Sequence, residues 1–243
     1  MSANLVGDVT IRYADLHPQV PGDGVPVLLL HGFGTDFGMN WRAAGWVQAL
    51  GAAGTRVIGP DLRGHGASGK PTDSAFYLPE HFVADLVAML DETGVDKVDV
   101  VGYSMGSRLA WELALTAPER VRRVVLGGFG AKNAFDGADL SDPGSGDTPF
   151  DLVYRTVAAL PGNDAAALAA CARAQASRPF DPDPPLTGIP LLLVSGARDA
   201  LAEGAAELAE RCGGTHVEVP GRDHANAVSS RAFRQAVLDF LAD

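Results

Sequence analysis

Short apolar runs rich in valine, isoleucine and leucine recur along the chain and predict the strands of a β-sheet. They are nearly continuous in apolar residues, a pattern typical of parallel strands that are covered on both faces. The runs are 25–32, 55–61, 97–104, 121–128, 189–196 and 215–221. The segment DVTIRYADL at 8–16 alternates instead, which predicts a half-exposed antiparallel strand at an edge of the sheet.

Helical patterns lie between these runs. In 81–94, Phe82, Leu86 and the pair Met89–Leu90 keep a spacing of 3.6 residues, and Gly94 indicates the end of the helix. Two more helices are predicted across 107–118 and 233–241. Because strand and helix alternate nearly throughout, we expect an α/β fold with a doubly wound, mostly parallel central sheet.

The alternation is interrupted between residues 130 and 187. Residues 131–150 and 178–188 are rich in Gly, Asp and Pro and predict loops, whereas 151–162 and 163–177 predict helices. Two or three short helices cannot bury a core of their own. We therefore expect 130–187 to be a helical cap, inserted into a single core that is formed by 1–129 and 188–243.

Composition and charge limit the kinds of molecule that the protein is expected to bind. The chain has 243 residues, 47% of them hydrophobic, which suits a single folded domain. A net charge of -11 opposes binding to nucleic acid or anionic lipid. The first twenty residues lack the pattern of a signal peptide, and no apolar run reaches transmembrane length. We expect a cytoplasmic protein without membrane insertion, monomeric or homodimeric, that acts on a small molecule.

The two cysteines predict neither a disulfide framework nor a metal site. Cys171 and Cys212 lie far apart, without CxxC or Cys/His spacing. We expect two reduced thiols and no bound metal.

A serine between two glycines stands where a predicted strand meets a predicted helix, in VVGYSMG at 100–106. Such a turn lifts Ser104 above the carboxyl edge of the sheet, where ligands bind in open α/β folds. The backbone approaches so closely there that a Cβ at Gly102 or Gly106 would clash. These features predict that Ser104 is a nucleophile.

The chain resembles the α/β-hydrolase fold superfamily over nearly its whole length. The resemblance rests on PVLLLHGFG, GPDLRGHGASGKP, GYSMGS, GARDA and GRDHANAV, which follow in the order typical of that superfamily. The chain is most similar to its small bacterial esterases, enol-lactonases and meta-cleavage-product hydrolases. It departs at Ser107, where many relatives have a second glycine, and we expect this hydroxyl to cap a backbone N–H of the first helical turn.

A serine hydroxyl needs a base to take its proton and a carboxylate to orient that base. His224 lies between the last predicted strand and the last helix and is the predicted base. His31 and His65, in loops at the same edge, remain alternatives. Asp199 follows a strand directly and is the predicted acid, since the order Ser, Asp, His is expected of this fold. Asp223 is too close to its neighbour His224 to orient it and should brace the loop.

Acyl transfer also needs donors for the negative charge that grows on the carbonyl oxygen. We expect the backbone N–H groups of Met105, at the helix start, and Phe33, in HGFG, to form this oxyanion hole, in part because the resemblance implies it. Their side chains should line the pocket. Asp61, Arg63 and His65 are expected to brace a loop by hydrogen bonds and an ion pair.

Together these features predict a serine hydrolase that cleaves a small carboxylic ester, thioester or lactone and requires no cofactor. C–C bond hydrolysis of a dienone-type product, acyl transfer and perhydrolysis on the same residues stay open, as does a non-catalytic receptor of the same fold. Within the superfamily that the chain resembles, the serine at position 104 argues against haloalkane dehalogenases and epoxide hydrolases, which have aspartate at the corresponding position. Alanine-rich runs in 130–187 predict small apolar pocket walls. We expect Arg155, Arg173 and Arg178 to face solvent, with contact to an anionic substrate as the alternative.

Overall fold

The predicted strands and helices follow one another in the expected order, and the structure adds a strand at 2–6 and helices at 46–52 and 205–211 that the sequence analysis does not name. The computed structural model describes residues 2–6, 9–20, 22 and 24–242. The strands are β1 (Ser2–Val6), β2 (Val9–Leu16), β3 (Val27–Leu30), β4 (Val57–Asp61), β5 (Val98–Tyr103), β6 (Val121–Gly127), β7 (Leu191–Gly196) and β8 (Thr215–Val219). The α-helices are α1 (Trp46–Ala52), α2 (Pro79–Glu92), α3 (Met105–Thr116), α4 (Pro149–Ala158), α5 (Ala165–Ser177), α6 (Ala205–Arg211) and α7 (Arg231–Ala242). Shorter helical turns are η1 (Gly38–Arg42), η2 (Ser74–Tyr77), η3 (Pro118–Arg120) and η4 (Ala200–Ala202).

The described strands form one eight-stranded sheet in the order β1-β2-β4-β3-β5-β6-β7-β8. The strands from β4 to β8 in this order are parallel, and β1 and β2 are antiparallel, which confirms a mostly parallel sheet. The prediction that β2 is an edge strand is wrong, because β1 pairs with its outer side. Asp8, the first residue of that predicted strand, lies outside the described residues.

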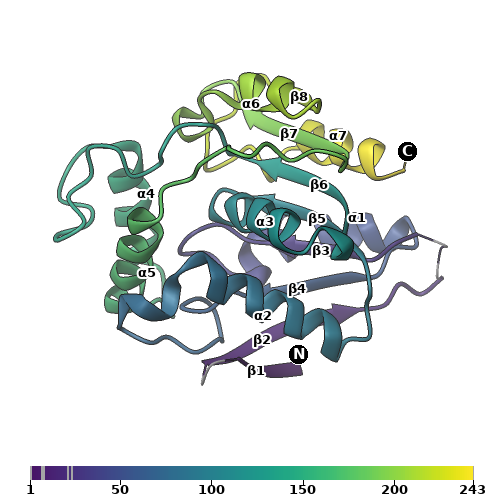
Figure 1. The fold of residues 1–243 in the computed structure, drawn as a ribbon, viewed down its shortest axis with the longest axis horizontal. Coiled ribbons are helices and arrows are strands. Elements are labelled where there is room, and N and C mark those ends of the chain that lie inside the picture. The colour runs from purple at the N-terminus through teal and green to yellow at the C-terminus, as the bar shows by residue number, and fades with distance from the viewer. Residues whose placement is uncertain (1, 7–8, 21, 23, 243) are drawn as a thin grey trace.

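Helices cover the sheet on both faces, as a doubly wound fold requires (Figure 1). Successive side chains of a strand point to opposite faces, so Leu28 and Leu30 pack with α2 and α3, whereas Val27 and Leu29 pack with α1 and α7. The edge strand β8 is the exception to the predicted burial. Most of its residues are exposed or half-buried, and the strand lies at the end of the sheet.

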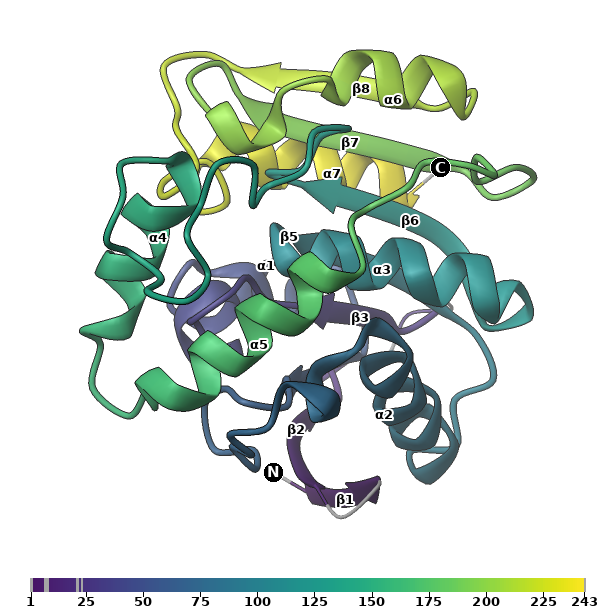
Figure 2. The same ribbon diagram turned by 60° about the vertical axis from the view of Figure 1, so that its left-hand side comes forward.

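The 130–187 segment connects β6 to β7 and contains α4 and α5. Figures 1 and 2 both show these helices beside the sheet, at the end toward which the arrow of β6 points. Thr148 caps α4, where its side chain accepts from the Asp151 N–H, and Asp164 caps α5 in the same way through Ala167. The loops on either side therefore end at defined helix starts, close to the edge that carries Ser104.

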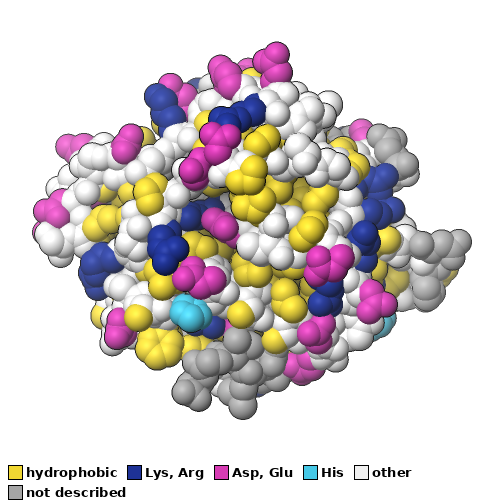
Figure 3. Space-filling model, viewed as in Figure 1, with side chains coloured by type: hydrophobic (Ala, Val, Ile, Leu, Met, Phe, Trp, Pro, Cys, Tyr) yellow, Lys and Arg dark blue, Asp and Glu magenta, His cyan; other side chains and the backbone are white. Residues whose placement is uncertain are grey.

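The surface shows no broad basic patch on the face seen in Figure 3, where acidic and basic side chains are interspersed. Within the described ranges, none of the helices is both long and apolar enough to cross a bilayer. Cys171 and Cys212 are both free thiols, as predicted.

Candidate active site

Ser104 occupies the tight turn between β5 and α3. Its φ of 54° is the one positive φ of a non-glycine residue in the described chain, a strained conformation that persists only when its surroundings hold it. A Cβ at Gly102 would lie 2.3 Å from the Gly106 carbonyl oxygen, and one at Gly106 would lie 2.1 Å from that of Leu30. Both glycines are thus required by close backbone approach, as the sequence predicts, and the turn projects Ser104 from the sheet edge.

Three predicted residues meet in a continuous chain of hydrogen bonds. The Ser104 Oγ lies 2.9 Å from the His224 Nε2, and the His224 Nδ1 lies 2.9 Å from each carboxylate oxygen of Asp199. The Asp199 side chain is fully buried, and its Oδ1 also accepts from the Leu201 N–H. An ionised Asp199 favours the tautomer with a proton on Nδ1 and leaves Nε2 free to accept the serine proton.

The His224 loop is held from two sides. The Tyr103 hydroxyl donates to the His224 carbonyl oxygen, and the two rings lie 5.4 Å apart. The Asp223 Oδ1 accepts from the N–H groups of Ala225 and Asn226. Asp223 therefore braces the loop, as predicted, and does not touch the imidazole of its neighbour.

The loop after β3 brings the Phe33 backbone beside Ser104. A Cβ at Gly32 would lie 3.4 Å from the Ser104 Cβ. The Asn40 Oδ1 accepts from the Gly32 N–H, and the Asn163 amide donates to the Gly34 carbonyl oxygen. In the described chain neither the Phe33 N–H nor the Met105 N–H donates to a protein acceptor. Both donors are thus free to bind an oxyanion next to Ser104.

The loop after β4 is braced as expected. The Asp61 carboxylate accepts from the N–H groups of Phe37 and Ala67, and Arg63 forms a buried bidentate ion pair with Asp85 of α2. The bond to Phe37 holds this loop against the one that carries Phe33, and the ion pair holds it against α2.

His31 and His65, the alternative bases, are fully buried structural residues. The His31 Nε2 accepts from the Leu62 N–H, and the His65 Nδ1 donates to the Arg63 carbonyl oxygen. Burial lowers the pKa of His31 to about 4. Burial, together with the nearby His31, lowers the pKa of His65 to about 3. Because both pKa values lie well below 7, both rings stay neutral in the folded protein near neutral pH. Their ring centroids lie 5.3 Å apart.

We expect these two histidines to make the fold sensitive to acid. In the unfolded chain each takes up a proton near its ordinary pKa of about 6.5, whereas the folded protein resists protonation down to pH 4. The contribution of the two neutral histidines to the free energy of unfolding is therefore fully present above about pH 6.5, and it is lost as the pH falls below that value. Urea unfolding should give about 2 kcal/mol less stability per histidine at pH 5 than at pH 7.5.

The variant His65→Gln should reduce this difference between the two pH values by about half. His81→Gln, which changes an exposed histidine of α2, serves as the matched control and should behave as the wild type. An unchanged pH dependence in His65→Gln would show that other groups cause the acid sensitivity.

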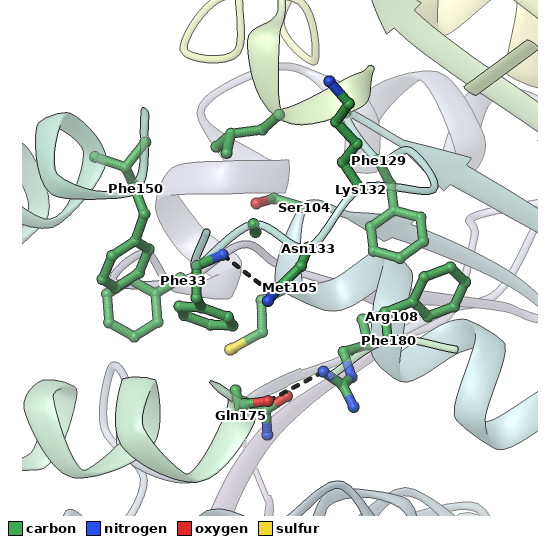
Figure 4. A pocket seen from close by; sticks show the side chains of 15 residues that line it. Phe33, Ser104, Met105, Arg108, Phe129, Lys132, Asn133, Phe150, Gln175 and Phe180 are labelled. Atoms are coloured by element: carbon green, nitrogen blue, oxygen red, sulfur yellow. Dashed lines mark hydrogen bonds between the residues drawn. The ribbon is translucent and has the colours of Figure 1, made fainter. Parts of the chain in front are cut away.

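Two hollows border Ser104 in the described structure. The outer one is an open cleft of about 610 Å³ between α4 and the His224 loop, and it contains Asp199, His224 and Leu152. The inner one is a cavity of about 70 Å³ with walls that are mainly apolar (Figure 4). Phe33 lines both hollows and Met105 lines the inner one, as predicted.

Two expectations about the surroundings need correction. The Ser107 hydroxyl does not cap the helix; it donates to the Gly127 carbonyl oxygen of β6, because this turn of α3 faces the sheet. The inner cavity has bulky walls, because the alanines of α5 are buried against the core and phenylalanines fill the space instead. These walls are Phe33, Phe129, Phe135, Phe150 and Phe180. Arg155, Arg173 and Arg178 are exposed and line neither hollow, in agreement with the expectation that they face solvent.

Two polar residues of the inner cavity escaped the sequence analysis. Arg108 lies one helical turn after Ser104 on α3, and Gln175 lies near the end of α5; both are buried. The sequence offered one indication for each: Arg108 is a cation on an otherwise apolar face of its predicted helix, and Gln175 is an amide in an alanine-rich helix. Only the packing of α5 on α3 brings the two together.

The described residues hold no cluster of three or more His, Cys, Asp or Glu side chains that could bind a metal ion.

Comparison with known proteins identifies the family of this chain. A family model described as alpha/beta hydrolase fold matches residues 25–163. The chain is 37% identical over 117 residues to an epoxide hydrolase of Caballeronia sordidicola, a match that covers 48% of this chain and 35% of that protein. It is 40% identical over 114 residues to a 2-hydroxymuconate semialdehyde hydrolase of Pseudomonas putida, covering 47% and 39%. The matches thus span little more than a third of these relatives.

Among solved structures, the enol-lactonase from Burkholderia xenovorans LB400 superimposes with a TM-score of 0.83 over 100% of both chains, at 23% identity. At this identity the likeness concerns the fold.

Proposed function

Because this chain belongs to the α/β hydrolase fold family, we propose that it is a serine hydrolase that cleaves a small carboxylic ester, thioester or lactone. The observation that carries the proposal is the hydrogen-bonded chain from Asp199 through His224 to the strained Ser104. Ser104 is the nucleophile, His224 the base and Asp199 the acid that orients it. These groups perform the reaction without a cofactor.

In the first half of the reaction the Ser104 Oγ attacks the carbonyl carbon while His224 Nε2 takes its proton. The carbonyl oxygen becomes an oxyanion, which the N–H groups of Phe33 and Met105 stabilise. When the tetrahedral intermediate collapses, the bond to the leaving alcohol breaks, and His224 returns the proton to that alcohol. The product of this half is an acyl group on Ser104.

In the second half a water molecule in the outer cleft attacks the acyl group. His224 takes a proton from this water, the same two N–H groups hold the oxyanion, and Ser104 leaves as its hydroxyl form. An alcohol or hydrogen peroxide in place of water gives acyl transfer or perhydrolysis. We propose that the 130–187 segment serves as a cap, since Leu152 and Val157 of α4 form one wall of this cleft.

Ser104 favours a carbonyl substrate over an epoxide, although several relatives are epoxide hydrolases. A serine oxygen that opened an epoxide would form an ether, which a general base and water do not cleave. Attack on an ester forms a new ester, which they do cleave. The side chain at position 104 therefore supports acyl chemistry.

A second candidate is hydrolysis of a C–C bond next to a carbonyl, as the similarity to the 2-hydroxymuconate semialdehyde hydrolase suggests. The same residues would attack a ketone, and the carbon leaving group would need a proton. A non-catalytic receptor is the remaining alternative, and it predicts no turnover of either substrate.

Trapping the acyl-enzyme tests the proposal directly. After rapid acid quenching of a reaction with p-nitrophenyl acetate, we expect mass spectrometry to find one acetyl group on the peptide that contains Ser104. Styrene oxide, the matched electrophile without a carbonyl, should leave the peptide unmodified. Modification by styrene oxide alone would overturn the assignment in favour of epoxide chemistry.

A further inference from the structure

The inner cavity is apolar along its walls but has a polar end. Arg108 of α3 and Gln175 of α5 contribute to its lining, with 7% and 1% of their surfaces exposed. Figure 4 shows both side chains beyond Met105 as seen from Ser104. Buried polar groups normally have hydrogen-bond partners, so the contacts of these two side chains indicate what the cavity binds.

Arg108 has one buried donor to spare. Its two terminal nitrogens donate to the carbonyl oxygens of Gln175 and Arg178, and one of them lies 3.5 Å from a Glu112 carboxylate oxygen. The Nε has no protein acceptor among the described residues. Burial lowers the pKa of Arg108 and Glu112 opposes that shift. Glu112 lies beside the guanidinium and balances its charge, and within the described chain the Nε is the one nitrogen left without a protein acceptor.

Gln175 has one buried acceptor to spare. Its Nε2 donates to the Tyr77 carbonyl oxygen over 2.7 Å, which fixes the orientation of the amide, because a reversed amide would set two oxygens against each other. Its Oε1 has no protein donor within the described chain. Two residues that line the same cavity thus carry a buried donor and a buried acceptor without protein partners in the described part of the chain.

The other charged and amide side chains that line this cavity are engaged elsewhere. Lys132 forms an ion pair with Glu203 and is largely exposed. The Asn133 Oδ1 accepts from the Phe135 N–H, and its amide nitrogen lies near Asp136. Recognition at the polar end therefore falls to Arg108 and Gln175.

We propose that Arg108 and Gln175 form the end of an acyl-binding subsite for a short acyl group that bears a hydroxyl. The inference rests on the proposed serine hydrolase function and specifies its substrate class. A hydroxyl accepts from the Arg108 Nε and donates to the Gln175 Oε1, so that one group satisfies both atoms. A carboxylate would set a negative oxygen against Oε1, and a methyl group would leave both atoms unpaired.

The size of the cavity limits the acyl chain. Its volume is about 70 Å³, less than half of the roughly 150 Å³ of a cavity that binds benzene. This leaves room for about three non-hydrogen atoms beyond the carbonyl carbon. Arg108 follows Ser104 by one helical turn, a rise of about 6 Å, so a hydroxyl on the third carbon extends toward it.

Two isosteric esters test the subsite. Methyl 3-hydroxypropanoate and methyl butanoate differ by a hydroxyl in place of a methyl group, and monomethyl malonate supplies a carboxylate. We expect the wild-type kcat/KM, measured by pH-stat titration and divided by each ester's rate with hydroxide, to be about tenfold higher for the hydroxy ester than for butanoate. Monomethyl malonate should be the poorest of the three.

Variants assign the preference to these side chains. Gln175→Met keeps the length of the side chain and removes Oε1, so the hydroxy-to-butanoate ratio should fall to near one. Arg108→Lys, which lacks an Nε donor, should lower the same ratio. Gln235→Met changes an exposed glutamine of α7 and should keep the wild-type ratio.

The outcomes separate this inference from the function on which it rests. Hydrolysis of the hydroxy ester and butanoate at equal normalised rates would support the serine hydrolase function and overturn the proposed subsite. Water would then be the hydrogen-bond partner of the Arg108 Nε and the Gln175 Oε1. A preference for the malonate ester would overturn it in favour of an anion site. Failure to hydrolyse any ester would overturn both proposals.

Discussion

Replacing Ser104 with alanine should lower kcat/KM for p-nitrophenyl butanoate by about 10⁴-fold or more, with little change in melting temperature. Alanine lacks the Oγ that lies 2.9 Å from the His224 Nε2 but places the same Cβ in the turn. The nucleophile is thus lost, whereas the close packing around Gly102 and Gly106 remains. Labelling by a fluorophosphonate probe should disappear together with the activity.

The matched control is Ser195→Ala. Ser195 of β7 forms the other serine–histidine hydrogen bond among the described residues, with its Oγ 2.8 Å from the His216 Nε2. It lines neither hollow beside Ser104, so this variant should retain both labelling and hydrolysis. Labelling that survives Ser104→Ala and disappears in Ser195→Ala would move the nucleophile to the second pair.

Asp199→Asn should lower kcat by about 10³- to 10⁴-fold while the protein remains folded. The two carboxylate oxygens lie 2.9 Å from the His224 Nδ1, and the Leu201 N–H holds Oδ1 in place. In asparagine the amide nitrogen takes the place of Oδ2. It donates to Nδ1, which favours the tautomer with the proton on Nε2, and that nitrogen can no longer accept the Ser104 proton.

Asp223→Asn distinguishes this orienting role from a general loss of acidic charge. Its Oδ1 braces the loop by accepting two N–H groups, which the asparagine oxygen can also do. We expect its kcat to fall less than tenfold. A larger loss than in Asp199→Asn would identify Asp223 as the acid that matters. Steady-state kinetics with p-nitrophenyl butanoate, with circular dichroism to check folding, measure both variants.

Much of the fold follows from patterns that are local in the sequence. Continuous apolar runs separated by helical spacing predict a parallel sheet, and the carboxyl ends of parallel strands share one edge. Residues in the loops that follow strands, such as Ser104, Asp199 and His224, are therefore expected near one another although they are distant in the chain. Gly102 and Gly106 are predictable for the same reason, since a turn this tight leaves no room for a Cβ.

Features that depend on packing between distant elements were not predictable. The pairing of β1 with the outer side of β2 removed the predicted edge, and the Ser107 hydroxyl found its partner on β6 rather than in its own helix. In each case the local pattern is compatible with several partners. The choice depends on which element lies alongside.

The sequence by itself determined the order of strands and helices, the turn at Ser104 and the shared edge of the residues proposed for chemistry, because these depend on backbone conformation and local periodicity. Only the tertiary structure decided what surrounds them. Arg108 and Gln175 are neighbours at the inner cavity because α5 of the inserted segment packs beside α3, where the Arg108 guanidinium reaches the Gln175 carbonyl oxygen. Side-chain neighbours across such a distance arise from the burial of whole surfaces, which no short stretch of sequence specifies.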